Sequence, residues 1–207
     1  LDNAREAHDH QTTATVLGYT AQLTHAEGMT TAALERLTAA LTHAERAPAI
    51  APWLASIQAS IHADSGDHTA ATDALHRAEP ASSRPTKQLP LLTDYGPAHL
   101  AAATGHTHLQ AGNHTAARAA LTAALDQLPP TARRARILVL TDLATAELHA
   151  GTLPDACRHA ITAADLLHHT PYATGTTHLH AFRTAAARPI GPRALRALDE
   201  HLAHLAA

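Results

Sequence analysis

Small and apolar residues recur along the chain at fixed distances from four glycines, Gly28, Gly66, Gly112 and Gly151. Alanine stands five and twelve residues after every glycine, and leucine, or alanine in the fourth case, stands nine residues after it. Seven residues before each glycine the side chain is again small. These positions are Ala21, Ala33, Leu37 and Ala40; Ala59, Ala71, Leu75 and Ala78; Gly105, Ala117, Leu121 and Ala124; and Ala144, Ala156, Ala160 and Ala163.

The pattern predicts a helical hairpin that is repeated four times. Offsets of five, nine and twelve lie on one stripe of a helix, so the helix after each glycine buries one face. The small residue before the glycine lies about two turns up the preceding helix, where only Ala or Gly allows close packing. Glycine itself is the residue that ends a helix in the left-handed conformation.

The same spacing gives the expected elements. We predict one domain over 1–207, with hairpins at 12–46, 49–79, 96–128 and 131–168, divided into helices at 12–27 and 30–46, 49–65 and 68–79, 96–111 and 113–128, and 131–150 and 153–168. Residues 80–95 contain three prolines and are expected to form a loop. Residues 172–206 are expected to form a C-terminal capping hairpin, and residues 1–8 the tail of a truncated preceding repeat.

The register resembles that of the tetratricopeptide repeat (TPR), over about residues 14–168. Gly, Ala, Leu and Ala stand at the repeat's consensus offsets, as does the small residue before the glycine. The resemblance implies a right-handed α-solenoid of about five hairpins, although the large aromatics of the motif are mostly missing. An unrelated array of α-hairpins with similar geometry remains the alternative.

The C-terminal half is similar to a narrower group, the C-terminal TPR region of actinobacterial helix-turn-helix (XRE-type) transcriptional regulators. The likeness rests on residues 138–146, 150–151, 155–157, 172–183 and 193–199, with Trp53 and Tyr95 in agreement. It implies a cytoplasmic regulator whose repeats sense a ligand, bind a partner or form a homodimer. No DNA-binding domain lies within these 207 residues, so we expect the chain to be a fragment that does not itself contact nucleic acid.

Composition narrows the fold class and the compartment. The chain is 45% hydrophobic but only 2% aromatic, and its apolar residues are mainly Ala and Leu, which favours an all-α protein. The net charge is −3 and Lys87 is the single lysine, so no strong basic patch for nucleic acid is expected. No run of about 18 apolar residues indicates a membrane span. One cysteine, Cys157, and no visible signal peptide favour the cytoplasm.

Histidine is the most conspicuous candidate for chemistry, with 19 residues. No two histidines are four residues apart, and His201 and His204 form the single pair at a spacing of three. Solvated helix faces are the expected role, with a weak surface metal site at that pair as the alternative. Cys157 is expected to be an inert core thiol, and no catalytic or phosphate-binding motif is present. We therefore expect no enzymatic activity, no cofactor and no metal.

The candidate site follows from the predicted solenoid, in which first helices line the concave face. Residues at thirteen, ten, six, three and two positions before each glycine supply the lining. Its larger or polar members are Gln22, His25, Trp53, Ser60, Asp64, His99, His106, Gln110, Thr141, Thr145 and His149. A peptide, small molecule or protein is expected to bind there, with Trp53 as the aromatic anchor. The alternative is a set of ordinary solvated side chains.

Two further points bear on partners. Arg133, Arg134 and Arg136 form the single compact basic cluster, either a solvated helix face or an anion contact. The clamp by which some TPR domains hold an acidic C-terminus is not expected, because Gly18, Gln22 and Ser56 stand where that clamp has Lys and Asn. A stand-alone TPR scaffold without a role at DNA is the alternative function.

Overall fold

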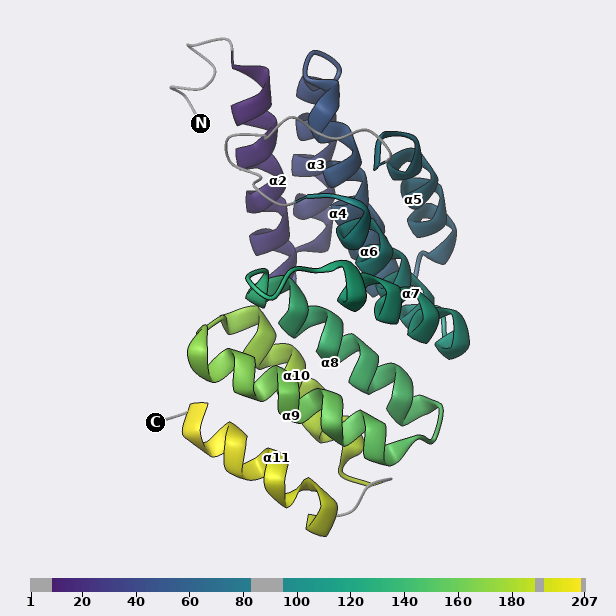
Figure 1. Ribbon diagram of the computed structural model, residues 1–207. Coiled ribbons are helices and arrows are strands. Elements are labelled where there is room, and N and C mark those ends of the chain that lie inside the picture. The colour runs from purple at the N-terminus through teal and green to yellow at the C-terminus, as the bar shows by residue number, and fades with distance from the viewer. Residues whose placement is uncertain (1–8, 83–94, 189–191, 206–207) are drawn as a thin grey trace. The chain divides into compact units, whose positions relative to one another are not determined.

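The computed structural model describes residues 9–82, 95–188 and 192–205, and within these residues it contains helices and no strand (Figure 1). The predicted all-α class is confirmed. The chain divides into two compact units, residues 1–103 (unit 1) and residues 104–207 (unit 2), and the division falls inside one helix, α6.

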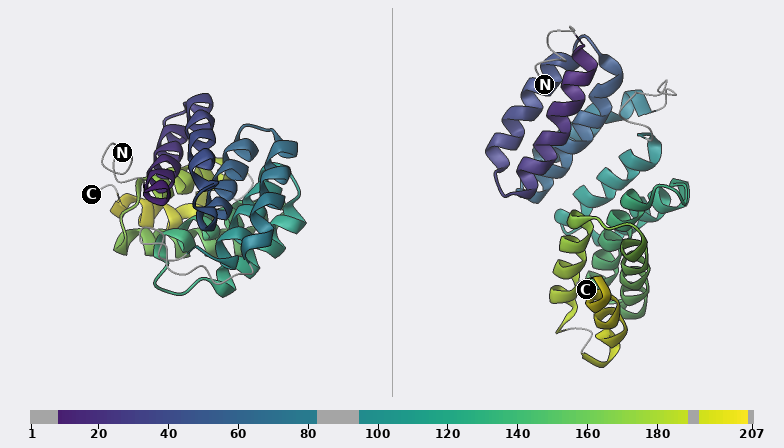
Figure 2. Two further views of the ribbon diagram at one scale, coloured as in Figure 1. Left: turned by 90° about the horizontal axis from the view of Figure 1, so that it is seen from above. Right: turned by 90° about the vertical axis from the view of Figure 1, so that its left-hand side faces the viewer.

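Unit 1 is built from two helical hairpins and the start of α6. The elements are α2 (His10–Ala26), α3 (Thr30–Ala44), the 3₁₀ turn η1 (Pro48–Ile50), α4 (Ala51–Asp64), α5 (His68–Ser82) and the first half of α6 (Pro97–Gln110). The helices α2 and α3 pack closely against each other, as do α4 and α5. Figure 2 shows α2 and α3, in purple and blue, side by side and antiparallel.

Unit 2 continues with the second half of α6 and five further helices. These are α7 (His114–Gln127), α8 (Arg133–His149), α9 (Leu153–His169), α10 (Ala173–Ala186) and α11 (Pro192–Leu205). The helices α8 and α9 pack closely against each other, α10 packs on α8 and α9, and α11 packs mainly on α9 (Figure 1). The last two helices thus pack on the preceding hairpin.

The four marker glycines end their helices as predicted. Gly28, Gly66, Gly112 and Gly151 all have φ between +74° and +82°, the left-handed region that side chains disfavour. After each one, the next backbone N–H turns back to a carbonyl five residues earlier, as in Met29 to Thr24 at 3.1 Å and Asn113 to His108 at 2.8 Å. This is the Schellman arrangement, which satisfies the last carbonyls of a helix.

The aligned apolar positions also lie where the pattern predicts. All the alanines at the offsets of five and twelve are fully buried, and Leu37 and Leu121 are as well. On the first helix, a β-carbon at Gly105 would lie 2.5 Å from Cγ of Leu121 and 3.1 Å from its backbone nitrogen. The small residue is therefore required by the close approach of α6 and α7.

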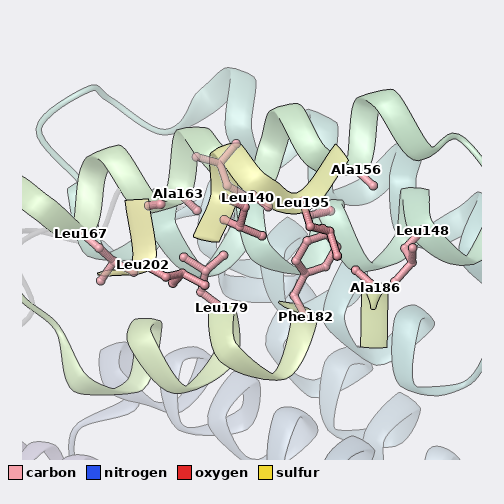
Figure 3. Close-up of a cluster of buried hydrophobic side chains, with 14 of the residues drawn as sticks. Leu140, Leu148, Ala156, Ala163, Leu167, Leu179, Phe182, Ala186, Leu195 and Leu202 are labelled. Atoms are coloured by element: carbon pink, nitrogen blue, oxygen red, sulfur yellow. The ribbon is translucent and has the colours of Figure 1, made fainter. Parts of the chain in front are cut away.

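Larger side chains fill the remaining core of each unit. In unit 1, Leu54 and Ile61 of α4 join Leu37 in a cluster between α2, α3 and α4, and the hydroxyl of Tyr95 donates to the Pro52 carbonyl at 3.0 Å. In unit 2, Figure 3 shows Phe182 of α10 pointing into a cluster that includes Leu140 and Leu195. No helix in the described part of the chain is both long and apolar enough for a membrane span.

The helix boundaries agree with the expected ones to within a few residues, with two differences of note. Helix α2 begins earlier than expected, at His10, because the Asp9 carboxylate accepts a hydrogen bond from the Thr12 N–H at 2.9 Å and caps the helix. Helix α5 continues through Pro80 to Ser82, which corrects the start of the expected loop. The expected tail at 1–8 and the rest of that loop up to 94 lie outside the described residues.

Candidate functional site

The eleven predicted lining residues fall into two groups, one in each unit. Unit 1 holds Gln22, His25, Trp53, Ser60, Asp64 and His99, and unit 2 holds His106, Gln110, Thr141, Thr145 and His149. Within each group the structure brings some side chains together and places others elsewhere. The contacts differ between the unit 1 group and the unit 2 group.

In unit 1, His25 and Asp64 meet between the first helices of successive hairpins. Nε2 of His25 lies 3.0 Å from Oδ2 of Asp64, and the ring's Nδ1 is 3.3 Å from the Thr30 hydroxyl. Both members of this pair stay partly exposed, so a ligand can reach them. The pair joins α2 to α4 at the ends of these helices.

Three other members of the unit 1 group have different surroundings. Gln22 is exposed on α2. The Ser60 hydroxyl donates to the Ser56 carbonyl of its own helix at 3.2 Å. The His99 ring lies 5.7 Å from the Tyr95 ring.

Trp53 is not an exposed anchor, which corrects the expectation for this residue. Its side chain is only 7% exposed and belongs to the core of unit 1. A β-carbon at Gly18 would lie 2.6 Å from Cη2 of the indole, so the ring occupies space that Gly18 leaves on α2. The Tyr19 ring covers it at 4.9 Å between centroids. The indole therefore packs α4 against α2 instead of facing a ligand.

In unit 2, His106 meets an acid that the spacing did not predict. Nδ1 of His106 lies 2.9 Å from Oδ2 of Asp142, and these side chains are 13% and 15% exposed. The pair joins α6 to α8, the first helices of successive hairpins. Pairs of histidine and aspartate thus connect neighbouring first helices in both units.

The remaining members of the unit 2 group make contacts of a different kind. Thr141 is buried and donates to the Ile137 carbonyl at 2.8 Å, which corrects its expected place in the lining. Thr145 donates to the Thr141 carbonyl at 2.9 Å, and Gln110 is exposed at the end of α6. Hydroxyls that bond back to their own helix offer little to a ligand.

His149 stacks on His114, a residue that sequence reasoning also missed. The ring centroids are 4.7 Å apart and the rings are nearly parallel, at 8°. Burial lowers the pKa of His114, and the neighbouring His149 lowers that pKa further, because a second positive charge beside the first is unfavourable. The stack links the N-terminus of α7 to the C-terminus of α8.

Glu147 is the most buried charged side chain of this region, at 8% exposure. Its carboxylate accepts a hydrogen bond from Nε of Arg118 at 2.8 Å and another from the Thr152 hydroxyl. Glu147 thereby ties α7 and α8 to the turn before α9. Its place, four residues before Gly151, is outside the offsets that defined the predicted lining, so no sequence signal marked it.

Replacing Glu147 by glutamine is expected to lower the free energy of unfolding by about 1–2 kcal/mol, because a buried charge-assisted hydrogen bond is lost while Arg118 can partly rehydrate. Urea denaturation followed by circular dichroism measures the change. The matched control is Asp155→Asn, which removes an exposed pair with Arg158 on one helix and is expected to change stability by less than about 0.5 kcal/mol. Equal effects of the two substitutions would contradict the role of burial.

The arginines of the predicted basic cluster and Cys157 contact other parts of the fold. Arg136 donates to the carbonyls of Leu125 and Leu128, at 3.1 and 2.9 Å, and Arg134 lies over the Tyr172 ring at 5.4 Å. Burial raises the pKa of the half-buried Cys157 thiol, which disfavours the reactive thiolate.

Metal-ligating types do not gather in the described residues. No three or more His, Cys, Asp or Glu side chains of those ranges form a group that could hold a metal ion. His201 of the expected weak pair contacts Asp165, and the His204 side chain lies outside the described side chains.

The predicted lining thus provides hydrogen-bonding and ionic side chains on the first helices, in one group in unit 1 and another in unit 2. Comparisons of the chain with protein-family models, with curated proteins and with solved structures found no match.

Proposed function

We propose that this chain is a TPR-like interaction module, a right-handed α-solenoid of about five hairpins that binds a peptide segment on its first helices. The observation that carries the proposal is the repeated hairpin. Each of the four glycines with positive φ is followed at the same spacing by buried alanines, so the same helical hairpin occurs four times. Repeats of this kind bury a core only by stacking, and they leave one helix face per repeat for partners.

The exposed side of α2 supports a peptide ligand. Tyr19, Gln22, Leu23 and Ala26 lie at helical spacing along one stripe, and Tyr19 and Leu23 are 44% and 65% exposed. The stripe combines two apolar side chains with an amide, and the His25–Asp64 pair lies beside it. Such a surface fits a segment that carries a large apolar residue and backbone groups for hydrogen bonding.

The same surface argues against a clamp for an acidic C-terminus. That clamp needs a cation on the first helix, and the position is Gly18 here, whose neighbouring space the Trp53 ring fills. A lysine at this position would displace the indole. The proposed ligand is therefore an internal or neutral segment and not a cluster of carboxylates.

The experiment selects binders first and then tests where they bind. A display library of random dodecamer peptides is panned on the chain, and the affinity of a selected peptide is measured by calorimetry. The double variant Gln22→Ala/Leu23→Ala is expected to lose about tenfold in affinity. The control Glu35→Gln, on the exposed face of the second helix α3, is expected to bind as the unaltered chain does. Failure to select any peptide, or equal losses in both variants, would overturn the proposal.

We further propose that the module belongs to a cytoplasmic transcriptional regulator and contributes sensing or homodimerisation, as the likeness of residues 138–146 and 172–183 to that group implies. A scaffold that joins proteins without a role at DNA is the second candidate. The regulator and the scaffold hypotheses make different predictions for the full-length protein. A DNA-binding domain upstream of Leu1, with promoter binding by the whole protein, favours the regulator, and its absence favours the scaffold.

A further inference from the structure

Among the described side chains, an apolar seam and the ionic contacts of Asp199 and His201 hold helix α11 to the rest of unit 2. Leu195, Leu198 and Leu202 are buried in the core cluster, two of them beside Phe182 and Leu179 in Figure 3. The guanidinium of Arg183 on α10 makes a two-point ion pair with Asp199. The third attachment joins His201 to Asp165 of α9.

His201 is placed so that both ring nitrogens face hydrogen-bond acceptors. Nδ1 lies 2.7 Å from the carbonyl oxygen of Ala197, one turn back on α11, and Nε2 lies 2.9 Å from Oδ1 of Asp165. A carbonyl and a carboxylate oxygen can only accept. Since neutral imidazole carries one N–H and imidazolium carries two, only the protonated ring makes both hydrogen bonds.

The His25–Asp64 pair of unit 1 shows the contrast. There the second nitrogen faces the hydroxyl of Thr30, which can donate as well as accept. Neutral His25 can therefore donate to Asp64 and accept from Thr30 at the same time. Losing a proton leaves that pair's hydrogen bonds complete, whereas at His201 it leaves one acceptor without a donor.

We propose that His201 is a proton-dependent latch that docks the C-terminal helix α11 onto α9. The latch is closed when the ring is protonated and donates both hydrogen bonds, and it weakens as the pH rises and the ring loses one of its protons. Release of α11 would uncover the apolar faces of Leu195, Leu198 and Leu202. This inference concerns the attachment of one helix and is independent of the proposed peptide surface.

The charged and titratable groups described around His201 lie on α9, α10 and α11. Asp165 faces it from α9, and its carboxylate can only accept a hydrogen bond from the ring. Arg183, from α10, stays charged and is bound to Asp199. His168 and His169 lie in the turn after Asp165 on α9 and are further histidines near the latch, so one of them must serve as the control.

Hydrogen–deuterium exchange tests the latch on the whole chain. Protection of the backbone amides in 195–205 is measured from pH 5.5 to 8 and corrected for the intrinsic exchange rate. In the unaltered chain, this protection is expected to fall about three- to tenfold over that range, as a partly exposed ion pair and one hydrogen bond are lost. His201→Gln and Asp165→Asn are expected to show low protection of α11 at every pH, and His168→Gln is expected to behave as the unaltered chain.

Nuclear magnetic resonance of the imidazole nitrogens gives a second measurement that does not depend on a variant. Below the transition, both His201 nitrogens are expected to show attached protons. Protection of α11 that does not change with pH, pH dependence that persists in His201→Gln, or a neutral His201 ring while α11 is fully protected would each overturn the proposal.

Discussion

Replacing Trp53 by alanine is expected to lower the free energy of unfolding of unit 1 by about 3–5 kcal/mol. The indole is 7% exposed and fills the space that Gly18 leaves between α2 and α4. Alanine would leave a cavity there, because helix backbones held by other contacts collapse only partly around a missing ring. The sequence predicts Trp53 as an aromatic anchor for a ligand, and the burial of the indole turns the expected effect of its removal from binding to stability.

Urea denaturation followed by far-ultraviolet circular dichroism measures the loss, since the variant has no tryptophan fluorescence. Trp53→Phe is expected to lose less, because a smaller ring still fills part of the space. Leu23→Ala is the matched control on α2: its side chain is 65% exposed, and its removal is expected to change stability by less than about 0.5 kcal/mol. If Trp53→Ala lost less than about 1 kcal/mol of stability and bound peptide more weakly, the indole would be a binding residue and not a core residue.

The hairpins could be predicted from the sequence because their causes are local. A glycine with positive φ, a small residue two turns before it and a stripe of alanines behind it act within one hairpin. The chain therefore repeats them in a readable register, and Gly112 and Ala117 occupy the same conformation and burial as Gly28 and Ala33. The start of α2 differs from the expected one because the Asp9 side chain caps the helix, and the repeat spacing does not include that residue.

The candidate site could not be predicted to the same degree because its contacts join different offsets. His106 stands six residues before its glycine and Asp142 stands nine before the next one, yet their side chains meet at 2.9 Å. A search that compares like positions in each hairpin cannot find such a pair. Trp53 shows the same limit, since its burial depends on the absence of a side chain at Gly18, one hairpin earlier.

The varied contacts of polar residues are a second reason why the candidate site could not be predicted from the sequence. Threonine in a helix can bond to the carbonyl of the preceding turn, as Thr141 does to Ile137, and this removes a hydroxyl from the surface without any change in the pattern. Histidine likewise has roles that depend on its neighbours: His25 and His106 bind carboxylates, while His149 stacks on His114. The 19 histidines are thus not one class of solvated side chain.

Replacing Gly105 by alanine is expected to lower the free energy of unfolding of unit 2 by about 1–3 kcal/mol, although alanine is the better helix former by about 1 kcal/mol. The added β-carbon would lie 2.5 Å from Cγ of Leu121 and 3.1 Å from its backbone nitrogen. A rotamer change can move Cγ, but the backbone of α7 can move only with its helix. The packing cost therefore exceeds the gain in helix propensity.

Gly96→Ala is the control, because a β-carbon at this glycine, just before the same helix, meets no atom within 4 Å. Its effect on urea denaturation is expected to stay within about 0.5 kcal/mol. The double variant Gly105→Ala/Leu121→Ala tests the cause: if the two side chains collide, the combined loss is smaller than the sum of the single losses. Additive losses, or a Gly105→Ala variant more stable than the unaltered chain, would show that a β-carbon at position 105 does not collide with Leu121 of the second helix.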